Sequence, residues 1–127
     1  MRDLANNIAA VQAVAPAVLT ATNTSAAIDL LGYNSAAVII NTGAIVGAGN
    51  FTPKLQESDA SGSGYTDVAA ADLVGTFPAA LAAASVVKVG YTGNRRYVRT
   101  VLTLNSGTSI AAGAVVIKGN AASKPSA

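Results

Sequence analysis

The chain has 127 residues, a length that fits one domain with a buried core, and its 51% hydrophobic content accompanies only 11% charged residues, against ~25% in typical soluble domains. It contains no cysteine and no histidine, which excludes disulfides, thiolate metal sites and the Ser-His-Asp and Cys-His catalytic arrangements, so we expect neither an enzyme nor a metal or cofactor site. The net charge of +2 is too small for nucleic-acid binding, and no stretch reaches the ~18 uninterrupted apolar residues of a membrane span, so we expect neither as a partner.

Residues 1–16 are interpreted as an N-terminal arm that precedes the folded domain. Asp3 is placed to cap a short helix through Leu4 and Ile8, which lie at helical spacing, and Pro16 would end that helix. An extended arm fits the same residues equally well. The segment faintly resembles a signal peptide, but an acidic residue in its basic region and polar residues in its apolar run argue against cleavage.

Residues 17–119 are predicted to form a single β-sandwich domain, followed by a C-terminal tail over residues 120–127. Short β-prone or alternating segments recur between turns rich in Gly, Asn, Ser and Asp. Strands are expected at residues 18–22, 26–30, 36–41, 51–58, 65–68, 85–91, 95–104 and 113–118. This spacing favours an all-β sandwich with jelly-roll topology, and an immunoglobulin-like order is the alternative because alternation cannot distinguish the two.

Several of these segments also carry predictions about their surroundings. Residues 36–41 form a short continuous apolar run, which is typical of a central strand buried on both faces. The glycine-rich residues 42–50 are expected to form a loop. Pro53 cannot donate a ladder hydrogen bond, so it places its strand at a sheet edge or at a strand start. In the last strand, Val115 and Ile117 are expected to point inward.

Candidate chemical sites are weak. Glu57 and Asp59 lie two residues apart at a predicted strand end, where paired carboxylates can do acid–base work. They border a Gly/Ser loop with no third group nearby, so a plain strand exit is the favoured interpretation. Residues 59–64 resemble a calcium loop only loosely, because the distal glutamate is missing. The glycines of residues 43–49 lack the Gly-Lys-Ser/Thr ending of a phosphate-binding loop.

Three arginines form the one cationic cluster of the sequence, with a tyrosine between them: Arg95, Arg96, Tyr97 and Arg99. Such a cluster can bind phosphate or nucleic acid, or can recognise acidic side chains across a protein interface, where Arg and Tyr are enriched. It can also lie on an exposed sheet face with intramolecular partners such as Asp67 or Asp72. Three arginines are too few for a nucleic-acid backbone footprint, so the interfacial and intramolecular interpretations are favoured.

Three segments of the sequence carry a family resemblance. They are residues 1–8 (MRDLANNI) with 15–22 (APAVLTAT), residues 54–59 (KLQESD) leading into 65–75 (YTDVAAADLVG), and residues 89–99 (VGYTGNRRYVR). Together they resemble the small head decoration, or cement, proteins of tailed bacteriophages and prophages, and the resemblance covers nearly the whole chain. Its motifs are structural rather than chemical.

The resemblance implies a virion structural protein that stabilises the assembled capsid by binding the outer surface of the major capsid protein. It implies a homo-oligomer, with a trimer favoured, on the capsid exterior after assembly in the host cytoplasm. The interface is expected to involve the arm and the cationic edge, namely Arg2, Asp3, Leu4, Ile8, Arg95, Arg96, Tyr97 and Arg99. The alternatives are a surface carbohydrate- or receptor-binding module, against which the lack of Trp counts, and a self-polymerising fibre subunit built by strand donation.

Overall fold

The structure is a computed structural model that describes residues 3–121, and it consists almost entirely of β-strands, as the sequence predicts. Two short 3-10 turns accompany the strands, η1 (Ala5–Asn7) and η2 (Ala70–Asp72). The strands are β1 (Ile8–Leu19), β2 (Asn23–Thr24), β3 (Ile28–Asp29), β4 (Tyr33–Val46), β5 (Asn50–Ser58), β6 (Thr66–Asp67), β7 (Leu73–Val74), β8 (Val86–Tyr91), β9 (Tyr97–Ser106) and β10 (Ser109–Ala121).

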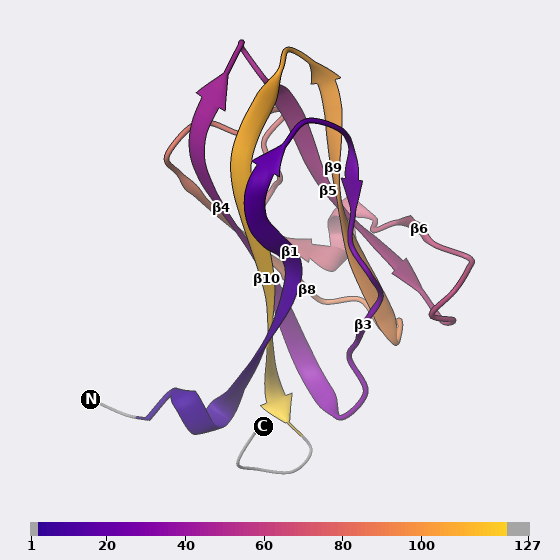
Figure 1. The fold of residues 1–127 in the computed structure, drawn as a ribbon. Helices are drawn as coiled ribbons and strands as arrows, with labels where there is room; N and C mark the ends of the chain where they lie inside the picture. The colour runs from indigo at the N-terminus through magenta and orange to yellow at the C-terminus, as the bar shows by residue number, and fades with distance from the viewer. Residues whose placement is uncertain (1–2, 122–127) are drawn as a thin grey trace.

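The strands form two antiparallel sheets that pack into a sandwich (Figure 1). Sheet A has the order β1-β10-β4-β8-β7, and sheet B has the order β2-β9-β5-β6, with β3 also paired to β9. The pairing is nested along the chain: β1 pairs with β10, β2 and β3 with β9, β4 with β8, and β5 with β6. Nested antiparallel pairs that wrap into two sheets are the jelly-roll arrangement, the first choice from the sequence.

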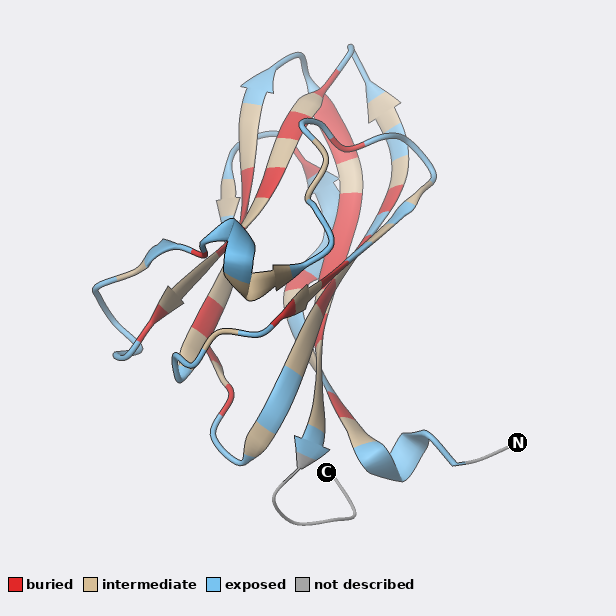
Figure 2. Ribbon diagram, turned by 180° about the vertical axis from the view of Figure 1, so that it is seen from behind, coloured by how far each residue is buried: buried red, intermediate tan, exposed pale blue. Residues whose placement is uncertain are grey.

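The hydrophobic core lies between the two sheets, where buried positions recur along the strands (Figure 2). Phe51 and Leu102 of sheet B and Ile110 of sheet A are fully enclosed, at 0% exposure. Each large aliphatic or aromatic side chain buried in this way contributes roughly 1.5–3 kcal/mol. Side chains alternate along β5 and β9, and Phe51, Leu55, Val98 and Leu102 all point into this core.

Pro53 of β5 lies where the sheet has no partner strand. In an extended strand the N–H and C=O of one residue point to the same side, and the carbonyls of Phe51 and Leu55 accept hydrogen bonds from Leu81 and Val68 on the side of β5 away from β9. On that side β6 pairs only with Gln56 and Glu57. Pro53 therefore lacks its N–H on a side of β5 where no neighbouring strand would accept a hydrogen bond, and this part of β5 is a sheet edge, as predicted.

The N-terminal segment differs from the predicted arm over residues 1–16, because β1 begins at Ile8. The strand pairs with β10 along its whole length, and Ala9 and Val14 bury their side chains, at 6% and 3% exposure. Sheet pairing and burial outweigh the helical spacing of Leu4 and Ile8, so the predicted helix reduces to the η1 turn.

Sheet A also corrects several predictions made from the sequence, beginning with those for β4. β4 continues through Val46, so the expected loop over residues 42–50 reduces to the turn at its tip. β4 is central, but Ile39 lies half-buried on its outer side rather than being covered on both faces.

Ala112, Ala114 and Val116 of β10 turn their side chains into the core, so Val115 and Ile117 point outward, the reverse of the prediction. Pairing with β4 sets this orientation by placing Val116 opposite the buried Val38. The strand extends to Ala121, past the start of the tail predicted over residues 120–127.

Candidate functional site

Each arginine of the predicted cationic cluster has a partner within the chain. Arg95 and Arg96 lie in the loop between β8 and β9, and Arg99 lies on β9. Arg95 forms an ion pair with Asp59, and Arg96 binds Asp29 through two hydrogen bonds of 3.0 and 2.9 Å. Arg99 donates from Nε to Oε1 of Gln56 at 2.8 Å. The arginines of the cluster thus have intramolecular partners, as one of the interpretations predicted. The carboxylates are Asp29 and Asp59 rather than the expected Asp67 and Asp72.

The carboxylates named as partners from the sequence are engaged elsewhere or lie apart from the cluster. Asp67 of β6 pairs with Lys54 at 3.3 Å and accepts a hydrogen bond from the Gln56 amide. Asp72 follows Ala71 in η2, and no ion pair of the described residues includes it. Asp29 binds Arg96 through both of its carboxylate oxygens. The hydrogen bond from Arg96, and next that from the Leu31 N–H, lower the pKa of Asp29 to about 2.

The aromatic side chains leave little free surface for stacking a ligand. Cations cover one face of three tyrosine rings: Arg99 lies 4.1 Å from the Tyr65 centroid, Lys118 lies 4.6 Å from Tyr33, and Arg96 lies 5.0 Å from Tyr97. The other aromatic residues, Tyr91, Phe51 and Phe77, pack in or against the core. Sugars are usually bound on open aromatic platforms, so this arrangement counts against the carbohydrate-binding alternative.

A hollow of about 730 Å³ lies at the end of the sandwich beside the cluster. Its lining includes Tyr33, Ser35, Tyr91, Asn94, Arg95 and Arg96. The Tyr91 hydroxyl donates to Glu57 at 2.6 Å and accepts the Arg95 N–H at 3.1 Å. Burial, followed by the bond to Glu57, raises the pKa of Tyr91 far above its ordinary value. Tyr91, Arg95 and Arg96 of this hollow are therefore engaged in contacts within the fold.

The arm residues of the predicted interface lie before and at the start of β1. Asp3 accepts hydrogen bonds from the Ala5 N–H at 2.9 Å and the Asn6 amide at 2.6 Å, and Leu4 is 65% exposed. Ile8 opens β1 opposite Gly119, and Arg2 lies outside the described residues. The arm and the start of β9 lie toward the same end of the sandwich (Figure 1), but no hydrogen bond or ion pair between described residues joins them.

A surface that the sequence did not single out lies on the other side of the molecule. We call it the outer face of sheet A, meaning the side chains of that sheet that point away from the core. Its members are mostly apolar: Val18, Ile39, Val74, Val86, Val115 and Ile117, with Gln12, Asn41 and Lys88 among them. Val18 and Val86 are each 65% exposed, and Val74 is 62% exposed.

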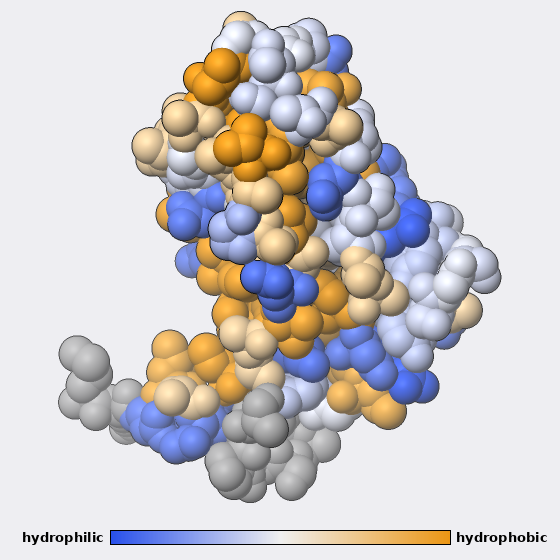
Figure 3. All heavy atoms as spheres, in the orientation of Figure 1, coloured by the Kyte–Doolittle hydropathy of each residue, from blue (hydrophilic) through white to orange (hydrophobic). Residues whose placement is uncertain are grey.

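The outer face of sheet A is hollowed between its exposed valines. Figure 3 shows hydrophobic residues gathered over β1, β10 and β4, interrupted by isolated hydrophilic ones. A depression of about 680 Å³ has Val18, Ile39, Val86 and Val115 in its lining, with Gly113 among them. Strands whose side chains are apolar on both faces are typical of sheets that are covered on both sides. This pattern in the sequence could have predicted the apolar outer face of sheet A.

The outer sides of the two sheets differ in chemistry. Sheet B turns Lys54, Gln56 and Arg99 outward, and these form ion pairs and hydrogen bonds with one another or with Asp67. Sheet A offers no such network among the described residues. A polar, internally paired face opposite an apolar face indicates that sheet A is the side suited to burial against another molecule.

The free edge of β1 is poorly shaped for adding a strand. Register shifts occur between Gln12 and Val14 and between Val14 and Ala17, and Pro16 lies within the second. Bulges and proline on an edge strand disturb the regular row of N–H and C=O groups that a donated strand needs. This feature counts against a fibre built by strand addition along that half of β1.

Residues 3–121 hold neither a metal-binding cluster nor a membrane-spanning helix. No group of three or more His, Cys, Asp or Glu residues is placed to hold a metal ion there. The same part of the chain has no helix of the length and apolar character needed to cross a membrane.

No protein-family model matches the chain, and no curated protein matches it. Among solved structures it is similar to a chain from the structure of infectious bursal disease virus, Gx strain, with 11% sequence identity and a TM-score of 0.45. The match covers 93% of this chain and 33% of the viral chain, so the protein spans about a third of that neighbour's length. A likeness at this level establishes neither family nor function.

Proposed function

We propose that this protein is a virion structural protein that decorates the assembled capsid of a tailed phage and stabilises it by binding the outer surface of the major capsid protein. The observation that carries the proposal is the exposed apolar outer face of sheet A, on a domain in which the charges of sheet B and of the cationic cluster are engaged internally. The three sequence segments that resemble head decoration proteins support the same role. Catalysis plays no part in it.

A jelly-roll sandwich suits this role because it is a rigid body with two broad faces. Stabilisation follows from mass action, since a protein that binds only the assembled shell shifts the equilibrium away from disassembly. We propose that the binding unit is a homo-oligomer, with a trimer favoured, placed on the capsid exterior. Binding to capsid protein places the molecule in the virion after assembly in the host cytoplasm.

The test is co-sedimentation of the purified protein with empty capsids, together with a mass measurement of the free protein. Saturable binding at a fixed ratio to the major capsid protein, and a higher temperature of capsid disruption, are the expected results. Failure to bind intact capsids would overturn the proposal. Retention on a glycan column would favour a receptor-binding module, and long polymers of free protein would favour a fibre subunit.

The contribution of the arm can be tested separately. Because β1 begins at Ile8, a deletion of residues 1–7 removes the part of the predicted arm that precedes the strand, with Arg2, Asp3 and Leu4, and leaves sheet A intact. A deletion that reached into residues 8–12 would remove part of a paired strand and would confuse lost binding with lost stability. If the shortened protein binds capsids as the full chain does, residues 1–7 take no part in the interface.

A further inference from the structure

We infer that the outer face of sheet A is the surface that seats on the capsid, and that it binds an apolar protein surface carrying a carboxylate that pairs with Lys88. This inference rests on the proposed function and names the contact through which it would act. It replaces the cationic edge at Arg95–Arg99 as the main binding surface, because those arginines already have partners within the chain.

Lys88 is the one charged side chain on this face among the described residues. The strands of sheet A contain two charged residues, Lys88 and Lys118. Lys118 turns to the inner side, where its Nζ lies 3.3 Å from the Asp29 carbonyl and over the Tyr33 ring. Lys88 is exposed opposite Ile39, and no hydrogen bond or ion pair of the described residues includes its side chain.

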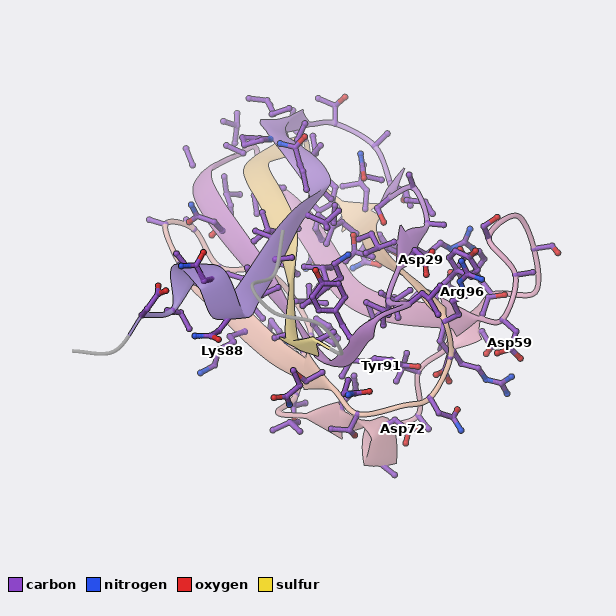
Figure 4. All side chains as sticks on the ribbon, turned by 90° about the horizontal axis from the view of Figure 1, so that it is seen from below. Asp29, Asp59, Asp72, Lys88, Tyr91 and Arg96 are labelled. Atoms are coloured by element: carbon purple, nitrogen blue, oxygen red, sulfur yellow. The ribbon has the colours of Figure 1, made fainter. Side chains whose placement is uncertain are left out.

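No acidic residue among residues 3–121 forms an ion pair with Lys88. Figure 4 shows Lys88 on the opposite side of the molecule from Asp29 with Arg96 and from Asp59. Lys88 lies on β8 beside Ile39, near the border of the outer face of sheet A, and it loses hydration when a partner surface covers it. This loss is unfavourable unless the covering surface supplies a negative charge and further hydrogen bonds.

Charge complementarity therefore selects the kind of partner. The strands of sheet A contain no Asp and no Glu, so two copies packed through this same face would bury Lys88 against residues that cannot pair with it. A different protein surface with a carboxylate at the matching position avoids that cost and also fixes the register of docking. Symmetric pairing of two outer faces is thus disfavoured.

The shape of the face agrees with this occupant. Val18 and Val86 protrude on either side of the depression, and Gly113 lies in its lining. A Cβ on Gly113 would lie 3.2 Å from Pro16, so a glycine there lets β1 pack closely against β10. The outer face of sheet A thus has two exposed valines beside a hollow, and the hollow can accommodate an apolar side chain that projects from the partner.

The first experiment measures capsid binding for charge variants of Lys88 with a matched control on sheet B. Lys88→Glu is expected to weaken binding at least tenfold, and Lys88→Gln is expected to weaken it less. Lys54→Gln removes the same charge from the opposite sheet and is expected to bind as the wild type does. Val86→Ser should also weaken binding, whereas Leu31→Ser, at a similarly exposed position beside the cationic cluster, should not.

The second experiment detects the carboxylate directly. A zero-length carbodiimide reagent joins a lysine amine to a carboxylate that contacts it, so the complex should yield a cross-linked peptide containing Lys88. Lys88→Arg keeps the charge but cannot form that amide, so this variant should bind capsids while losing the cross-link. Circular dichroism and thermal melts of each variant establish that the fold is retained.

The outcomes separate this inference from the proposed function. If the wild type does not bind capsids, the proposed function fails and the inference fails with it. If the wild type binds while Lys88→Glu and Val86→Ser bind equally well, the inference alone is overturned. If Arg96→Gln loses capsid binding while Lys88→Glu and Val86→Ser retain it, the cationic edge rather than sheet A is the binding surface. A higher oligomer in the wild type that Val86→Ser dissociates would assign the face to a second copy.

Discussion

Tyr91 of β8 and Glu57 of β5 join the two sheets through a hydrogen bond of 2.6 Å, in which the phenol donates to the carboxylate. The same phenolic oxygen accepts the backbone N–H of Arg95, so it also anchors the loop that carries Arg95 and Arg96. Gly93 crosses directly over this ring, and a Cβ there would lie 2.5 Å from the Tyr91 oxygen. The cationic loop is therefore placed by a buried structural contact.

The first prediction concerns removal of this hydroxyl. Tyr91→Phe leaves the Arg95 N–H and the Glu57 carboxylate without their partner in a half-enclosed setting, and should lower the free energy of unfolding by about 1–3 kcal/mol. Tyr65→Phe is the control, since its hydroxyl bonds to the Ser61 carbonyl at an exposed position. Chemical denaturation followed by circular dichroism measures both. Equal effects of the two substitutions would contradict the structural role of Tyr91.

The second prediction is a loss of stability in alkali. Burial, and next the bond to Glu57, raise the pKa of Tyr91 in the folded protein above its value of ~10 in the unfolded chain. The folded state then holds the proton more tightly, so this contribution is complete below pH ~10 and declines as the pH rises further. Denaturation at intervals from pH 8 to 11 should show a steeper decline for the wild type than for Tyr91→Phe. Parallel curves would refute the assignment.

The third prediction is a loss of stability in acid that depends on Asp29. The Arg96 hydrogen bond and the Leu31 N–H hold the pKa of Asp29 at about 2, below its value in the unfolded chain. The contribution is therefore present above pH ~4 and is lost as the pH falls through about 2. Both side chains are more than 40% exposed, at 43% and 46%, so solvent screening keeps the effect small.

Asp29→Asn should flatten the acid limb of the stability curve, measured as the free energy of unfolding between pH 5 and pH 2. Asp72→Asn removes the same charge from a residue that forms no ion pair in the described part of the chain, and serves as the control. If the control flattens the curve as much as Asp29→Asn does, general charge rather than the Asp29–Arg96 pair governs acid stability.

The strands that could be predicted well from the sequence are those with one polar face. In β5 the apolar Phe51 and Leu55 alternate with Lys54 and Gln56, so only one orientation buries the apolar set. In β10 both alternating sets are apolar, and the register with β4 decides which points inward. The wrong orientation of Val115 and Ile117 thus has the same cause as the unpredicted apolar face: sheet A is apolar on both sides.

The candidate site was harder to predict than the fold because its partners are distant in sequence. The cationic cluster is visible in the sequence, but Arg96 pairs with a carboxylate 67 positions away and Arg95 with one 36 positions away. Only the jelly-roll topology brings Asp29 of β3 to the start of β9. Lys88 could not be singled out from the sequence, because a single lysine among valines gives no sign that it lies on an exposed apolar face. The pairing of the strands in sheet A reveals that position.

The fourth prediction concerns Thr100, which is fully buried in sheet B with a hydroxyl that lacks a partner among the described residues. Its backbone N–H donates to the Ser25 hydroxyl at 2.9 Å, so the backbone group is satisfied while the side-chain oxygen is not. Thr100→Val replaces that hydroxyl with a methyl group of similar size and should raise the free energy of unfolding by about 1 kcal/mol. Ser25→Ala should have the opposite sign, because it removes the acceptor of the buried N–H and should cost about 1–3 kcal/mol. Denaturant titration of both variants provides the measurement. If Thr100→Val is the less stable protein, the Thr100 hydroxyl has a hydrogen-bond partner such as a buried water. The hydroxyl would then stabilise the core.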